Sequence, residues 1–108
     1  KHYQERTCEL FEAKGHPTIR QQAGTQQGYV HSISHGLGLA VHEAPWSGFT
    51  ASDENILAPG VVVTVEPGLY YPQRGVGVRL ENSLWMRPDG TPEPLADFPM
   101  DLVLPVRM

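Results

Sequence analysis

The chain has 108 residues, of which 40% are hydrophobic and 19% charged, a composition typical of one small globular domain. Its net charge of -4 provides no basic field for phosphates, which argues against nucleic acid as a partner. The longest apolar stretch, around residues 61–65, is too short to span a bilayer, so no membrane partner is expected.

The first predicted element is a helix over residues 1–14. The segment KHYQERTCELFEAK contains no Gly or Pro, its larger side chains recur at spacings of three and four, and Gly15 follows where a helix end favours glycine. The chain starts inside this helix without an obvious capping residue, so we expect further sequence before it. Its single cysteine, Cys8, cannot form an internal disulfide, which favours a reducing compartment and a cytoplasmic location.

The rest of the chain predicts short strands joined by turns, because its 11 Gly and 10 Pro all lie beyond residue 14. Residues 15–28 are expected to form a loop, and 43–60 an irregular excursion. The segment 87–91, RPDGT, has the chemistry of a hairpin turn, with 92–95 as its return limb. The expected strands are 28–34, 61–66, 76–86 and a last one near 102–106.

The strand expected over residues 76–86 has two different faces. Alternation places Val76, Val78 and Leu80 on one face, and Arg79 and Glu81 on the other. We expect the aliphatic face to be packed and the polar face to carry chemistry.

Two carboxylates at strand positions each have two interpretations. Glu66 ends the apolar run VVVTV, so it is either an exposed strand end or a buried carboxylate paired with a cation. Glu81 either forms an ion pair with Arg79 on the same face or binds a ligand.

Three of the five histidines, His31, His35 and His42, lie within one short segment. Gly36 and Gly38 separate the second from the third, so the backbone there can turn sharply or approach a ligand closely. An isolated histidine is usually structural, but three around a glycine-rich turn favour a functional site.

A histidine and two carboxylates on strands can hold a divalent metal ion. His35, Glu66 and Glu81 supply that set of donors. The flanking His31 and His42 could then handle the protons of a hydrolytic reaction.

Three motifs carry a resemblance to a known family. The segments HSISHGLGLAVHE, TVEPGLYY and GVRLEN, in this order, resemble the C-terminal motif set of the pita-bread (M24-type) metallopeptidase superfamily. The residues of these motifs are most similar to those of the Xaa-Pro aminopeptidase and prolidase branch, and the similarity extends over about residues 28–86. Three ordered motifs are specific where one alone would be weak. The resemblance implies an α+β fold, the C-terminal half of a pita bread, with an antiparallel, strongly curved sheet and one or few helices.

The resemblance also implies a ligand set. His35 would bind one of two metal ions, Glu66 would bind metal and act as general base toward the attacking water, and Glu81 would bridge both ions. The cofactor would be two divalent ions, Mn²⁺, Co²⁺ or Zn²⁺, because this donor set suits several metals.

Four further positions match residues that handle the substrate in the family. His31 and His42 would line the substrate site and steady the scissile carbonyl and the developing oxyanion. Arg79 and Tyr70 would support the carboxylates and contact the substrate.

The chain departs from the family pattern in lacking two aspartate ligands that the family carries on an upstream hairpin. None of the chain's aspartates precedes the histidine motif. We therefore expect residues 1–108 to be one partial domain without its N-terminal half. Partial or no metal occupancy is expected in this chain alone, with apolar surface that favours homo-oligomers or association with the missing half.

The resemblance thus implies the C-terminal catalytic segment of a dinuclear peptidase that cleaves the bond preceding proline. Its partner would be a peptide with proline after the scissile bond, and the isolated chain is expected to be inactive. Two alternatives remain, a non-catalytic binding module on the same fold and a creatinase-like hydrolase; retention of His35, Glu66 and Glu81 together argues against both.

Overall fold

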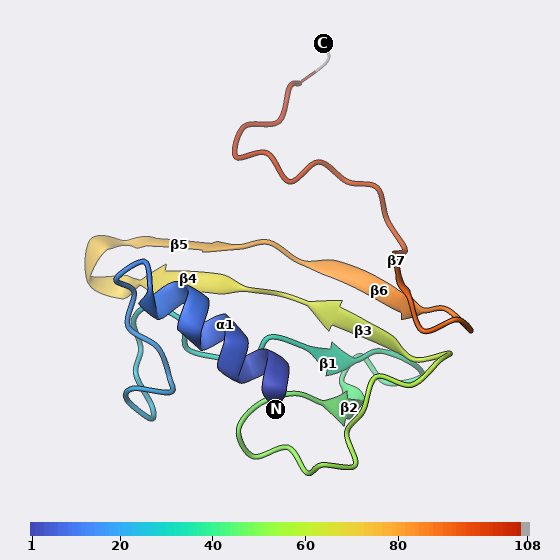
Figure 1. Ribbon diagram of the computed structural model, residues 1–108. Coiled ribbons are helices and arrows are strands. Elements are labelled where there is room, and N and C mark those ends of the chain that lie inside the picture. The colour runs from blue at the N-terminus through green and yellow to red at the C-terminus, as the bar shows by residue number, and fades with distance from the viewer. Residues whose placement is uncertain (107–108) are drawn as a thin grey trace.

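The computed structural model describes residues 1–106, which form one α-helix, seven short strands and a single 3₁₀ turn (Figure 1). The helix is α1 (His2–Glu12), and the 3₁₀ turn is η1 (Pro72–Arg74). The strands are β1 (His35–Gly36), β2 (Glu43–Trp46), β3 (Val62–Val65), β4 (Gly68–Tyr71), β5 (Val76–Arg79), β6 (Asn82–Met86) and β7 (Pro92–Pro94).

The strands form two antiparallel sheets. Five of them pair in the order β2-β1-β3-β6-β7, and β4 pairs with β5 in a separate two-stranded ribbon. Figure 1 shows this ribbon continuing the line of β3 and β6, since β4 follows β3 along the chain and β5 leads into β6. The predicted α+β class, with one helix and antiparallel strands, is confirmed.

The predicted helix is confirmed, and its C-terminal end has a clear physical cause. Gly15 adopts a φ of 83°, and its N–H donates to the carbonyl of Glu12 while the N–H of His16 donates to that of Phe11. This is the Schellman arrangement that ends many helices. Among the described residues, no helix combines the length and apolar character needed to cross a bilayer.

A small core lies beneath the helix. Cys8 from α1 packs with Tyr29 and Ile33, and all three are buried. Partly buried side chains surround this cluster: Phe11, Ile19, Phe49, Val65 and Leu69. The core therefore joins α1 to the segment that leads into β1.

Two strand predictions are confirmed within a residue or so of their bounds. The run expected at 61–66 forms β3, the central strand between β1 and β6. The RPDGT turn joins β6 to β7, with Arg87 N–H donating to the Thr91 carbonyl at 2.9 Å and Asp89 accepting from Thr91. The residues of the turn were therefore sufficient to predict this hairpin.

The single strand expected over 76–86 is wrong, because the chain changes sheets there. β5 pairs only with β4, whereas β6 pairs with β3 and β7, and Leu80 and Glu81 lie between them. The N–H of Leu80 donates to the carbonyl of Pro67 at the junction. The partner strand changes at this point because β3 and β4 are themselves separated by Glu66 and Pro67.

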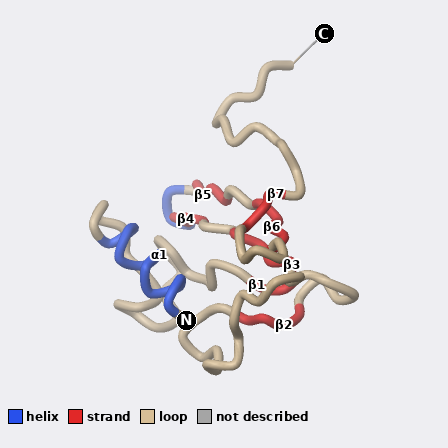
Figure 2. Tube along the Cα trace, turned by 45° about the vertical axis from the view of Figure 1, so that its right-hand side comes forward, coloured by secondary structure: helices blue, strands red, loops and turns tan. Residues whose placement is uncertain are grey.

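The strand expected over 28–34 is also wrong. Only Gly28 and Tyr29 form isolated bridges, to Tyr70 and Thr18, and the strand β1 begins later, at His35. No strand forms near 102–106 either, where exposed side chains find no neighbouring strand; residues 107–108 lie outside the described part. In Figures 1 and 2 the chain after β7 leads away from both sheets.

The expectation of a packed aliphatic face on this segment is wrong as well. Val76, Val78 and Leu80 are 54%, 49% and 46% exposed. Alternation identified which side chains share a face, but no described element covers that face.

Candidate metal centre

His35, Glu66 and Glu81 come from strand ends that the sheet register brings together. His35 opens β1, Glu66 directly follows β3, and Glu81 directly precedes β6. The antiparallel register pairs Val65 with Asn82, so the next position along the ladder lies at Glu66 and Glu81. Residues far apart in sequence thus meet at one end of the β3–β6 ladder.

These three side chains converge closely enough to share an ion. One ligand atom from each of His35, Glu66 and Glu81 lies within 4.8 Å of the others. His35 is half-buried, Glu66 is buried and Glu81 is exposed, so the cluster opens to solvent on the Glu81 side. Among the described residues no aspartate joins this group.

The hydrogen bonds of His35 indicate which ring nitrogen faces the site. Nδ1 lies 2.8 Å from the carbonyl oxygen of Gly36, which can only accept, so Nδ1 carries a proton. Nε2 lies 3.1 Å from Oε1 of Glu66. In a neutral imidazole protonated on Nδ1, the lone pair of Nε2 would face an oxygen of Glu66, and two acceptors repel each other. A proton or a cation between the two atoms removes this repulsion. The donor set therefore fits a divalent metal ion, with Nδ1–H fixing the ring as in known metal sites.

Glu66 is a buried carboxylate, so the alternative of an exposed strand end is wrong. It is 9% exposed, and its Oε1 accepts a hydrogen bond from Oγ1 of Thr64 at 3.1 Å. Its Oε2 lies 3.8 Å from Nη1 of Arg79. Within the described residues Arg79 forms its ion pair with Glu66 and none with Glu81, so the simple Arg79–Glu81 pair is not formed.

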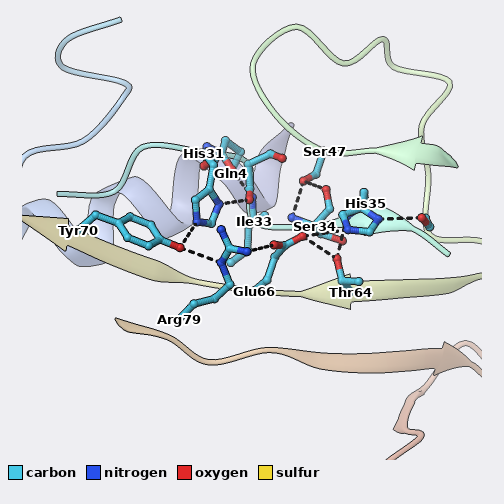
Figure 3. A network of polar contacts seen from close by, with 12 residues as sticks. Gln4, His31, Ile33, Ser34, His35, Ser47, Thr64, Glu66, Tyr70 and Arg79 are labelled. Atoms are coloured by element: carbon cyan, nitrogen blue, oxygen red, sulfur yellow. Dashed lines mark hydrogen bonds and ion pairs between the residues drawn. The ribbon is translucent and has the colours of Figure 1, made fainter. Parts of the chain in front are cut away.

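A line of polar contacts runs from Glu66 to His31 (Figure 3). Arg79 Nε donates to the hydroxyl of Tyr70 at 2.7 Å, and this hydroxyl lies 2.9 Å from Nε2 of His31. Nδ1 of His31 faces the carbonyl of Ser32 at 2.8 Å and must donate, so Nε2 accepts from Tyr70. The hydrogen bond to Tyr70 raises the pKa of Arg79, whose guanidinium is in any case charged and lies beside Glu66.

Two glycines make room for the Tyr70 ring. Tyr70 pairs with Gly77 across the β4–β5 ribbon, and Gly68 pairs with Arg79. A methyl group on Gly77 would lie 2.9 Å from a ring carbon of Tyr70, and one on Gly68 would overlap its hydroxyl end. The glycines of EPGLYY and GVGV thus let the phenol lie flat against the ribbon and reach His31.

His42 lies at the solvent side of the cluster. Its ring centroid is 4.3 Å from that of His35, and the two rings are inclined by 52°. The residue is exposed. All seven predicted site residues therefore gather in one region, with His31 and His42 at opposite ends of it.

Sequence reasoning missed three side chains that hold the site together. Gln4 binds the backbone around His31, Thr64 binds Glu66 and the N–H of His35, and Ser47 binds the backbone of Ser34. Gln4 was detectable, because it is a polar residue on the same helical face as Cys8 and Phe11. No local signal marked Thr64 or Ser47.

Similarity to known proteins extends over most of the chain. Residues 4–88 match metallopeptidase family M24. The chain is 39% identical over 72 residues to the Xaa-Pro dipeptidase of Pyrococcus furiosus, covering 67% of this chain and 20% of that protein. It is 33% identical over 93 residues to the Xaa-Pro aminopeptidase of Haemophilus influenzae, covering 79% and 21%. The crystal structure of X-Pro aminopeptidase from Thermotoga maritima superposes with a TM-score of 0.58 at 36% identity, over 77% of this chain and 22% of that one.

The chain therefore belongs to metallopeptidase family M24, and the resemblance drawn from its three motifs is confirmed. Its fold corresponds to part of the pita-bread fold of an X-Pro aminopeptidase. The chain spans about a fifth of the length of the relatives it matches.

Proposed function

We propose that this chain carries the C-terminal part of the catalytic site of an Xaa-Pro peptidase. The observation that supports this most directly is the convergence of His35, Glu66 and Glu81 in a chain of family M24. The names of the relatives, Xaa-Pro dipeptidase and Xaa-Pro aminopeptidase, support a peptide substrate with proline after the scissile bond. Residues 1–108 are then one partial domain, completed by ligands from elsewhere in the catalytic unit.

His35, Glu66 and Glu81 would hold the metal ions, and bound ions would supply Lewis-acid polarisation of the peptide carbonyl and activation of water. Two ions, Mn²⁺, Co²⁺ or Zn²⁺, are proposed for the complete site, because imidazole and carboxylate ligands suit all three. Glu66, which is buried beside the guanidinium of Arg79, would take a proton from the attacking water.

The remaining residues would act on the substrate. Tyr70 donates to His31 and accepts from Arg79, so these three side chains form one connected group beside the proposed metal site. The imidazoles of His31 and His42 are proposed to line the substrate site and to steady the carbonyl oxygen as negative charge develops on it; for His31 this requires a proton on Nε2, which accepts from Tyr70 in this structure. Arg79 keeps a positive charge next to Glu66 and orients the hydroxyl of Tyr70.

Metal binding by the purified chain tests this proposal. Titration calorimetry with Mn²⁺ or Zn²⁺ at high metal concentration should detect one weakly bound ion in the wild type, because this chain supplies only part of the ligand set; the affinity should be at least about tenfold lower in Glu66→Gln, since a ligand is lost. Glu54→Gln, an exposed residue outside the cluster, is the matched control and should bind as the wild type does. Equal affinities in all three proteins would contradict the assignment.

Turnover is a separate measurement. With Mn²⁺ added, we expect no hydrolysis of Xaa-Pro dipeptides or tripeptides by this chain alone, because three ligands do not make a two-metal site. Activity that Glu66→Gln abolishes would support the peptidase assignment while contradicting the inactivity of the chain.

Two further parts of the proposal rest on other features. Cys8 is a free, buried thiol, so we retain the cytoplasm as the proposed location.

The exposed aliphatic face of β5 supports self-association of the chain or association with another part of the catalytic unit.

A further inference from the structure

The segment that carries His31 is held mainly by side chains. Between Tyr29 and β1 it forms no regular ladder. The N–H and the carbonyl of Ser34 are both bonded to the hydroxyl of Ser47, at 2.9 and 2.6 Å. The carbonyl of Ile33 accepts from the N–H of Glu66 at 2.9 Å. Side chains thus replace part of the strand pairing that would otherwise fix this backbone.

Gln4 supplies the rest of this support from α1. Its Nε2 donates to the carbonyl of His31 at 3.0 Å, and its Oε1 accepts from the N–H of Ile33 at 2.8 Å (Figure 3). A residue of a parallel neighbouring strand would bond to the same two groups on either side of Ser32. The side-chain amide therefore imitates one residue of a parallel strand.

The amide of Gln4 is fixed from its other side as well. Its Oε1 accepts a second hydrogen bond, from the hydroxyl of Tyr29 at 2.9 Å. Gln4 and Tyr29 are 1% and 0% exposed, so water does not compete for these bonds. Burial raises the pKa of Tyr29, which keeps the donating proton in place. This geometry also assigns the amide orientation, since Tyr29 and Ile33 N–H both require an acceptor.

We propose that Gln4 is a positioning residue, which places His31 against Tyr70 and, through Ile33, places the backbone of Glu66. It touches neither substrate nor metal ligand side chains; it acts through the peptide groups on both sides of Ser32. The consequence for catalysis rests on the proposed function, whereas the consequence for the His31 ring does not.

Long-range ¹H–¹⁵N NMR of the histidine rings, at mildly alkaline pH, tests the proposal without requiring turnover. In the wild type we expect His31 as a single tautomer, protonated on Nδ1, as its contacts to Ser32 and Tyr70 require. In Gln4→Met, which keeps the length of the side chain but neither hydrogen bond, His31 should show averaged signals of both tautomers. The ring of His35 should keep its Nδ1–H signature, because Gly36 and Thr64 hold it.

Tyr29→Phe is the matched control. It removes one bond to Gln4 Oε1 but leaves the bonds to His31 and Ile33, so the His31 signature should persist. An unchanged His31 tautomer in folded Gln4→Met would overturn the proposal, and so would equal loss of the His31 and His35 signatures, which would indicate general loosening.

If Gln4→Met does not fold by circular dichroism, the same comparison is made with Gln4→Asn, whose shorter amide reaches only one of its partners. Failure of both variants to fold would show a need for Gln4 in the fold as a whole and would also overturn the positioning role. The ring signature is independent of metal binding. A positive result here together with no effect of Glu66→Gln on metal affinity would therefore reject the proposed function alone.

Discussion

At the scale of single residues, the chain places polar groups where a small core would otherwise be apolar. Glu66 and Gln4 are almost fully buried, and each is satisfied by several partners. A buried carboxylate without partners would cost several kcal/mol, so Thr64 and Arg79 are needed before Glu66 can serve any chemical role. Buried polar side chains such as these lower the stability of the fold but fix the geometry of the groups they bind.

Glu12 provides a pH-dependent test at this scale. Arg20 and the hydroxyl of Thr18 both donate to its carboxylate, and these bonds lower its pKa below the ordinary value of 4.5. A lowered folded-state pKa stabilises the fold above the unfolded pKa, and this contribution is lost as the pH falls through the folded pKa. The contact ties the loop after α1 back to the helix.

We therefore expect Glu12→Gln to be less stable than the wild type at neutral pH, with a difference that shrinks below about pH 4.5. Urea denaturation at a series of pH values measures it. Glu54→Gln should show no comparable trend. A difference that stays constant down to acidic pH would count against this role of the ionised carboxylate.

At the scale of elements, the β4–β5 ribbon is the unit that presents Tyr70 and Arg79 to the site. Register puts these two side chains on the same face, with Gly77 opposite Tyr70 and Gly68 opposite Arg79. The ribbon pairs with neither β3 nor β6 in the five-stranded sheet. Its geometry relies on the fit of Tyr70 over the glycines and on the contacts of Tyr70 with His31 and Gly28.

Gly77→Ala should disturb this ribbon. The added methyl group would lie 2.9 Å from the Tyr70 ring, so the ring must shift, and overpacking of this kind costs about 1–3 kcal/mol. We expect a lower free energy of unfolding in urea. Val78→Ala, on the opposite and exposed face of β5, should cost less than about 1 kcal/mol when both variants are measured at a concentration at which the chain is monomeric. If the alanine at 77 is as well tolerated as that at 78, the ring does not depend on the glycine.

At the scale of the whole molecule, the chain leaves more surface exposed than its size requires. Its accessible surface is 7783 Å², against about 6,000 Å² for a compact monomer of 12.0 kDa. Its radius of gyration is 15.2 Å, whereas a compact domain of this length has about 13 Å. The open ribbon and the segment after β7 account for this shape (Figure 2).

We expect the purified chain to self-associate through the exposed face of β5. Replacing Val76 and Val78 together with Lys should shift sedimentation and light scattering toward the monomer, because charges on that face oppose its burial. Leu39→Lys, at a fully exposed loop position, is the control and should not shift the distribution. A monodisperse wild-type monomer of 12.0 kDa would contradict this expectation.

The sequence by itself determined the local features and the chemical class of the site. The α1 helix, its glycine end, the β6–β7 hairpin and the motifs around His35 and Glu66 all follow from residues close to one another along the chain. Helix periodicity, turn chemistry and donor type are local properties, so the amino-acid sequence alone was enough to predict them.

Only the tertiary structure decided which partner each segment takes. Residues 76–86 are divided between two sheets, and the register of β3 with β6 brings Glu81 beside Glu66. The backbone of residues 28–34 forms no strand there and is hydrogen-bonded instead by the side chains of Gln4 and Ser47. The physical reason is that pairing and burial depend on neighbours distant in sequence, whose positions no local pattern records.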